Sequence, residues 1–116
     1  MKLWIDDVRC APEGYVWCKS VNEAKDVIEH FENNERFMCL GCEIITISSC
    51  FHDNIDLIDI DHHAGFYIID GGDYICLLEW LEETGRNYPI RIHSQNSVGV
   101  ENMRRVVERN GWKEVF

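Results

Sequence analysis

The sequence predicts one compact α/β domain over residues 1–116, built as three layers around a mostly parallel, five-stranded sheet. Two observations carry this prediction: the alternation of strand and helix patterns along the chain, and the length of the chain. Short runs rich in β-branched and aromatic residues alternate with segments whose apolar residues recur at helical spacing. Strands that alternate with helices form parallel sheets with right-handed crossovers, and a chain of this length holds one core.

The first two predicted strands lie close together in the N-terminal part of the chain. Residues 2–6 are mostly apolar and lead into the acidic pair Asp6 and Asp7. Residues 8–14 contain Pro and Gly without a helical period, which predicts a loop. Residues 15–18 are aromatic and β-branched, which predicts the second strand.

A capping box opens the first predicted helix, with Ser20 at the cap and Glu23 three residues later. Four apolar residues then repeat at helical spacing: Ala24, Val27, Ile28 and Phe31. We expect this helix to span about residues 21–32 and to stop at Asn33 and Asn34.

Residues 36–54 form an insertion before the central strand and allow two interpretations. Residues 37–40 and 43–47 would form a hairpin around Gly41. Alternatively, residues 37–40 end the preceding helix.

The second half of the chain predicts three strands and two helices. The predicted strands cover residues 55–61, 89–93 and 112–116, and the first of them is central and ends in Asp61. Residues 64–72 form a loop with an apolar middle. The apolar faces of the two helices consist of Tyr74, Leu77, Leu78 and Leu81, and of Val100, Met103, Val106 and Val107. A flavodoxin-like strand order fits this pattern.

The composition limits the partners. The net charge is −10, with 21 acidic residues against 11 Lys and Arg. This charge repels long nucleic acids, whose binding needs basic side chains, and suits a divalent cation or a small ligand. No apolar run approaches the about 20 residues of a membrane span, and no secretory signal is seen, so we expect a cytoplasmic protein without a membrane partner.

Acidic residues follow two predicted parallel strands, where the strands reach the carboxyl edge of the sheet. Asp6, Asp7 and Asp61 should converge there and hold a cation, because clustered carboxylates otherwise repel one another. Asp59 competes for the place of the third ligand, since a buried carboxylate needs a partner. The alternative is a solvated acidic rim.

Histidines stand at two of the same strand ends. His62 and His93, with Ser94, form a candidate acid–base pair and hydroxyl group, because imidazole transfers protons near neutral pH. The helix that begins after Asn96 would offer backbone N–H groups to an anion, and Gly99 would let a ligand approach closely. The alternative for each histidine is a hydrogen-bonded structural role.

Two further features are ambiguous. Arg9 would bind phosphate oxygens or form a surface salt bridge. The set Cys39, Cys42, Cys50 and His52 has zinc-binding residue types, but its spacing fits no standard zinc finger. We therefore favour reduced thiols for all six cysteines.

Several of these segments resemble receiver domains of response regulators, and most closely the cyclic-phosphate-processing receiver domains. The resemblance is carried by residues 3–9, 60–62, 72–74 and 90–103. Its most specific part is the pattern His-Ser-x-Asn-x-x-Gly over residues 93–99. It covers most of the chain apart from the insertion.

The resemblance implies a receiver-like domain with a metal at the three acids and a phosphate substrate facing His62, His93, Ser94 and Asn96. This sequence departs from the family at His63, where an Asp is usual, and in the loop after Asp7, which replaces the first receiver helix. Lys113 sits early in the last strand segment, unlike the Lys of ordinary receivers.

We therefore expect a metal-dependent hydrolase that acts on a cyclic or terminal phosphate of a small, nucleotide-like molecule with the help of Mg²⁺ or Mn²⁺. The alternative is a non-enzymatic receiver domain, in which Asp61 accepts a phosphoryl group or the domain binds a partner. The paired histidines favour the hydrolase, because a phosphoacceptor needs no such pair.

Overall fold

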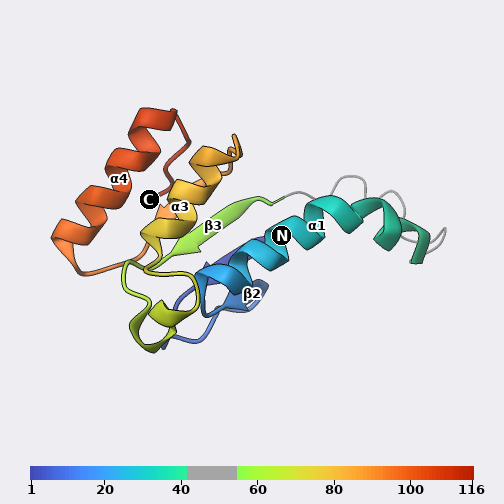
Figure 1. The fold of residues 1–116 in the computed structure, drawn as a ribbon, viewed down its shortest axis with the longest axis horizontal. Helices are drawn as coiled ribbons and strands as arrows, with labels where there is room; N and C mark the ends of the chain where they lie inside the picture. The colour runs from blue at the N-terminus through green and yellow to red at the C-terminus, as the bar shows by residue number, and fades with distance from the viewer. Residues whose placement is uncertain (42–54) are drawn as a thin grey trace.

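The computed structural model describes residues 1–41 and 55–116, and the side chains of residues 1–32 and 55–116. Figure 1 shows its helices and strands. In chain order they are β1 (Lys2–Ile5), β2 (Tyr15–Cys18), α1 (Val21–Gly41), β3 (Leu57–Ile60), η1 (Gly65–Ile69), α3 (Ile75–Glu83), β4 (Ile90–Ile92) and α4 (Ser97–Asn110). No helix among the described residues is long and apolar enough to span a membrane.

The strands form one parallel sheet in the order β2-β1-β3-β4. The predicted α/β class and parallel sheet are confirmed, with four strands where the sequence predicted five. The expected last strand is reduced to a single bridge between Ile90 and Glu114. Side chains hold this C-terminal segment in place instead of a strand pairing. Glu114 forms an ion pair with Arg104, and Trp112 is buried in the core.

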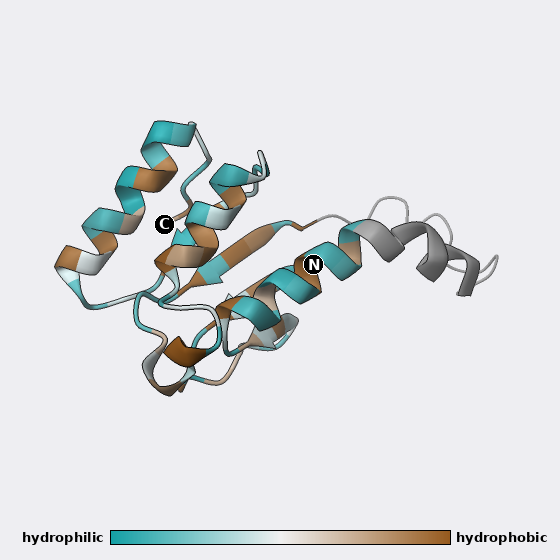
Figure 2. Cartoon of the chain, in the orientation of Figure 1, coloured by the Kyte–Doolittle hydropathy of each residue, from teal (hydrophilic) through white to brown (hydrophobic). Residues whose placement is uncertain are grey.

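The three α-helices pack on one face of the sheet, with α3 between α1 and α4 (Figure 1). The core lies between this face and the helices, and its strand residues are Leu3, Ile5, Cys18, Ile58, Ile60 and Ile90. Alternating strand residues such as Trp4 and Asp59 therefore point to the other face. Figure 2 shows hydrophobic and hydrophilic residues alternating in bands along the helices, as amphipathic packing requires.

The second helical layer that the sequence predicted has no counterpart among the described residues. In this strand order, only the connection from β1 to β2 would carry a right-handed crossover to the opposite face. That connection is a loop, as residues 8–14 predicted. The sheet face that bears Trp4 is therefore free of described helices.

Helix α1 begins where predicted but ends later. The backbone N–H of Glu23 donates to Ser20 Oγ at 3.0 Å, which confirms Ser20 as the cap. The helix continues to Gly41, so residues 37–40 belong to it and the hairpin interpretation of that segment is wrong. Asparagines cost a helix only a fraction of a kcal/mol each, so Asn33 and Asn34 do not stop it. The predicted strand over residues 43–47 lies outside the described residues.

Replacing Ser20 by Ala tests the architecture at the start of α1. Ser20 Oγ accepts from Glu23 and donates to Asp70 Oδ2 at 2.6 Å, so it joins the helix start to the loop after η1. Ser20→Ala should lower the free energy of unfolding by about 1–2 kcal/mol, measured by urea denaturation. Ser97→Ala removes an exposed hydroxyl and is the control. Equal stability of both variants would contradict this role.

Candidate functional site

The carboxylate of Asp6 lies buried at the end of β1, with 1% of the residue exposed. Its backbone N–H donates to the carbonyl of Cys18. Its Oδ1 accepts backbone N–H groups of Val8 at 2.9 Å and Arg9 at 2.8 Å, which folds the following loop around it. Burial raises the pKa of Asp6, but these two hydrogen bonds and one from His93 outweigh burial, so the pKa is lowered.

His93 follows β4 and lies between two carboxylates. Its backbone N–H donates to the carbonyl of Ile60, which extends the sheet by one residue. Its ring Nε2 is 2.9 Å from Asp6 Oδ2, and its Nδ1 is 2.6 Å from Asp59 Oδ1. The ring also stacks on Trp4, with centroids 3.9 Å apart and planes at 6°. These contacts leave the ring one orientation.

Asp59 explains why His93 is held so firmly. It lies in β3 on the helix-free face, and it is fully buried. One of its oxygens contacts His93, and the other accepts from Arg91 Nη1 at 3.2 Å. Burial lowers the pKa of His93, but the hydrogen bonds and charges of Asp59 and Asp6 outweigh burial and raise it. Asp59 thus fixes the ring of His93 through Nδ1, whereas the sequence indicated it as a competing ligand of the cation.

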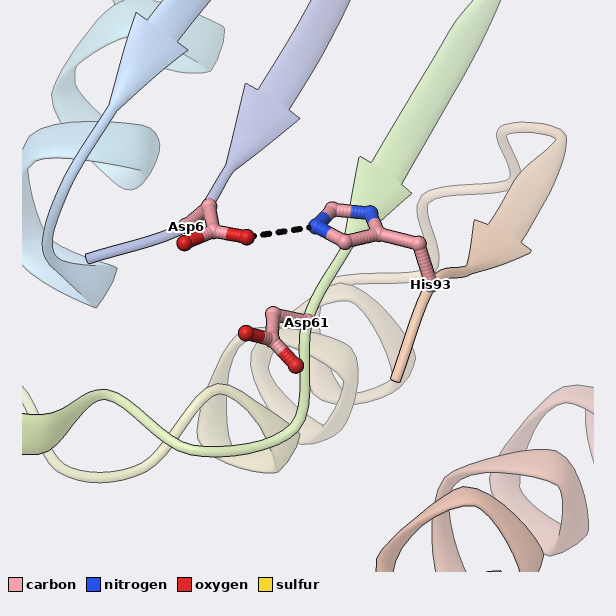
Figure 3. A group of neighbouring side chains, drawn as sticks. All are labelled: Asp6, Asp61 and His93. Carbon is pink, nitrogen blue, oxygen red and sulfur yellow. Dashed lines mark hydrogen bonds and ion pairs between the residues drawn. The ribbon is translucent and has the colours of Figure 1, made fainter. Parts of the chain in front are cut away.

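Asp61 completes a cluster at the carboxyl edge of the sheet. Its backbone N–H donates to the carbonyl of Ile5, and its Oδ1 accepts from the backbone of His62 at 2.7 Å. One ligand atom each from Asp6, Asp61 and His93 lies within 4.8 Å of the others (Figure 3). Asp61 therefore lies at the same edge as Asp6, as the parallel strand ends predicted.

The donor set of this cluster fits a divalent cation. Two carboxylates and an imidazole are oxygen and nitrogen ligands that such ions take in proteins. Asp7 is not in the group, because its carboxylate lies against η1. A Cβ added at Gly65 would stand 2.2 Å from Asp7 Oδ2, so glycine is needed there. The role of Asp7 as a ligand stays a prediction.

The ring of His62 lies over the first turn of α4. A Cβ added at Gly99 would stand 2.3 Å from this ring, so glycine makes room for the histidine. The close approach of a ligand at Gly99, expected from the sequence, stays a prediction. The Nδ1 atom of His62 is buried without a hydrogen-bond partner in the described part of the structure. Asn96 caps α4 as predicted, accepting from the backbone of Gly99 at 2.9 Å.

The remaining polar candidates lie around this centre. Ser94 Oγ accepts from the backbone N–H of Asn96 at 3.2 Å, so the hydroxyl lies at the start of α4. Arg9 has an exposed side chain, while its carbonyl accepts from the indole of Trp4 at 2.8 Å. His63 turns away, and its Nδ1 lies 3.1 Å from Asp73 Oδ1 beside α3. His63 is thus outside the cation cluster.

The proposed zinc set remains untested. Cys42, Cys50, His52 and the side chain of Cys39 lie outside the described residues. Three cysteines are described, and all are free: Cys10, Cys18 and Cys76. Burial raises the pKa of the Cys18 thiol to about 12, with a smaller contribution from Glu23, so this thiol stays protonated and inert.

The sequence did not reveal the support that surrounds the cluster. Trp4 and Arg91 were read only as strand residues, yet one stacks on His93 and the other pairs with Asp59. The signal was present in the strand alternation, because Trp4, Asp59 and Arg91 occupy matching positions in neighbouring strands. Aligning the predicted strands by their polar ends would have grouped them.

The parallel sheet, the acids at its carboxyl edge and the helix that begins beside them define a receiver-type α/β domain. A family model described as cyclic-phosphate processing Receiver domain matches residues 1–109. The chain belongs to this family, as the sequence resemblance predicted. No curated protein and no solved structure matches the chain.

The pH dependence of stability tests the pairing of His93. Because its pKa is raised in the folded state, it stabilises the fold below its unfolded pKa of about 6.5, and this contribution is lost as the pH rises through the folded pKa. In metal-free buffer, urea unfolding should show stability falling from pH 6 to pH 9. His93→Gln should flatten the fall, and the exposed His30→Gln should not. An unchanged slope in His93→Gln would contradict the pairing.

Proposed function

We propose that this domain hydrolyses a cyclic or terminal phosphate on a small, nucleotide-like molecule with the help of a divalent cation. The observation that carries the proposal is the convergence of Asp6, Asp61 and His93 at the sheet edge from which α4 begins. Membership of the cyclic-phosphate processing Receiver family supports it. Open parallel sheets bind ligands at this edge.

Asp6 and Asp61 are the residues proposed to hold the cation. Asp6 is suited to this because its Oδ1 is satisfied by the backbone, whereas its Oδ2 points toward the cluster. When bound, a divalent cation supplies Lewis acidity toward a phosphoryl oxygen. It would also neutralise the carboxylates, which otherwise repel a phosphate.

The first turn of α4 is the proposed phosphate site. Backbone N–H groups and the helix dipole favour an anion at a helix N-terminus. The hydroxyl of Ser94 lies beside this turn, and Asn96 fixes its conformation as the cap. Arg9 is a proposed additional contact, because its exposed guanidinium follows the Asp6 turn.

His62 is the proposed proton-transfer residue. Its ring is held against Gly99 at the first turn of α4, and it follows Asp61 directly. In the proposed reaction, water adds to phosphorus and one ring P–O bond breaks. The leaving oxygen takes a proton from the imidazole and becomes a hydroxyl, which leaves a phosphomonoester. The imidazole regains a proton from the attacking water.

The receiver alternative remains because Asp61 is partly exposed at the end of β3, where a phosphoryl donor has access. In that case Asp61 would accept a phosphoryl group or the domain would bind a partner. The histidines would then be structural.

Substitution of His62 separates the two functions. His62→Gln and His62→Ala should each reduce turnover of a responsive substrate at least about a hundredfold, with cation affinity nearly unchanged, because only proton transfer is lost. The measurement is phosphomonoester release from a panel of nucleoside cyclic monophosphates with Mg²⁺ or Mn²⁺. Asp61→Asn should weaken cation binding and turnover together, and His30→Ala, exposed on α1, is the control.

The contrary result is also specific. If no cyclic or terminal phosphate is turned over, while acetyl phosphate labels wild-type protein but not Asp61→Asn, the domain is a phosphoacceptor. Normal labelling of His62→Ala would complete that conclusion.

A further inference from the structure

We infer that His93 is a direct nitrogen ligand of the cation, through Nε2, and that the site therefore prefers a transition-metal ion such as Mn²⁺, Co²⁺ or Zn²⁺ over Mg²⁺. This inference rests on the cation site of the proposed function and specifies its third ligand. It gives His93 a role different from the acid–base role expected from the sequence.

The first support is the separation of the ligand atoms. His93 Nε2 and Asp6 Oδ2 lie 2.9 Å apart, and Asp61 offers an oxygen within 4.8 Å of both (Figure 3). Two adjacent ligands, each about 2.1 Å from a metal and at right angles, stand about 3.0 Å apart. The imidazole and the carboxylate therefore already have the spacing of neighbouring ligands.

The second support is the carboxylate behind the ring. Asp59 Oδ1 lies 2.6 Å from His93 Nδ1, on the opposite side of the ring from Asp6. Metal-binding histidines usually donate their other ring N–H to a carboxylate, which fixes the tautomer and makes the ligating nitrogen more basic. Asp59 is fully buried, so it acts as a positioning residue and not as a ligand.

The third support is the rigidity of the imidazole. Trp4 stacks on it in a nearly parallel arrangement, and the Trp4 indole is itself fixed by the carbonyl of Arg9. Arg91 holds the second oxygen of Asp59. A ligand that cannot rotate loses little entropy when it binds a metal. Among the described residues, His62 Nδ1 has no hydrogen-bond partner, and His63 Nδ1 contacts Asp73, which is not part of the cluster.

The ligand set decides the preference among metals. Mg²⁺ takes oxygen ligands and keeps several waters, whereas imidazole suits Zn²⁺ and the later transition metals, with Mn²⁺ accepting both kinds. A site with two carboxylates and one imidazole should therefore bind Co²⁺ or Zn²⁺ more tightly than Mn²⁺, and Mn²⁺ more tightly than Mg²⁺. A site formed by the carboxylates alone would lack the additional affinity for these transition metals that the imidazole nitrogen provides.

Pulsed electron paramagnetic resonance of bound Mn²⁺ tests the ligand directly. Metal-free protein of residues 1–116, loaded with Mn²⁺, should show coupling to a directly bound ¹⁴N nucleus. Labelling the histidines with ¹⁵N should replace this coupling by a ¹⁵N coupling. His93→Gln should lose the signal, and His63→Gln should keep it, because the His63 ring lies against Asp73. The wild-type spectrum does not depend on any variant folding.

Calorimetric titration tests the selectivity and the role of Asp59. His93→Gln should weaken Co²⁺ and Mn²⁺ binding at least about tenfold and change Mg²⁺ binding little. Asp59→Asn should weaken Co²⁺ binding about 10–100-fold while the ¹⁴N coupling persists, as expected for a positioning residue. Circular dichroism confirms that each variant is folded.

The outcomes distinguish this inference from the proposed hydrolase. Bound Mn²⁺ without ¹⁴N coupling, or a coupling that survives in His93→Gln, would overturn the inference while leaving hydrolysis with an all-oxygen site intact. Nitrogen coupling without turnover of any phosphate substrate would support the ligand and reject the hydrolase. Absence of binding by all four metals would overturn both the inference and the cation of the proposed function.

Discussion

The structure of the site depends on the burial of the Asp6 carboxylate. A buried charge is costly unless its oxygens receive hydrogen bonds, so the chain around Asp6 must supply donors. Val8 and Arg9 supply two from the backbone, and His93 supplies one from another strand. The indole of Trp17 also donates to the Asp6 carbonyl at 2.7 Å. The loop after β1 and the start of the segment after β4 are thus tied to one side chain.

This constraint connects the unusual architecture to the site. Because the backbone after Asp6 turns back onto its carboxylate, the connection from β1 to β2 forms a loop where a helix would otherwise cover the second sheet face. That face instead carries Trp4, Asp59 and His93, which pack on one another. A row of paired side chains, Arg91–Asp59–His93–Asp6, therefore runs across this face and ends at the carboxyl edge.

The sequence predicted what depends on local pattern. Helical spacing located α3 and α4, and the polar ends of parallel strands predicted that Asp6 and Asp61 would meet. It could not predict the direction of each side chain, because the partners lie far apart in the chain. His93 pairs with a residue 34 positions earlier, and only the folded register brings the two together. The same holds for Asp7, whose position against η1 depends on a turn at Gly65.

The charge at the sheet edge also affects how a cation and a phosphate bind together. Burial raises the pKa of the Tyr74 hydroxyl, and the charges of Asp7, Asp6 and Asp61 raise it further, so the negative field of this edge extends to the buried start of α3. A phosphate dianion approaching α4 meets that same field, and the positive charge of Arg91 is already paired with the Asp59 carboxylate. The proposed cation would offset most of this negative charge. Cation and phosphate should therefore bind cooperatively, each increasing the affinity of the domain for the other.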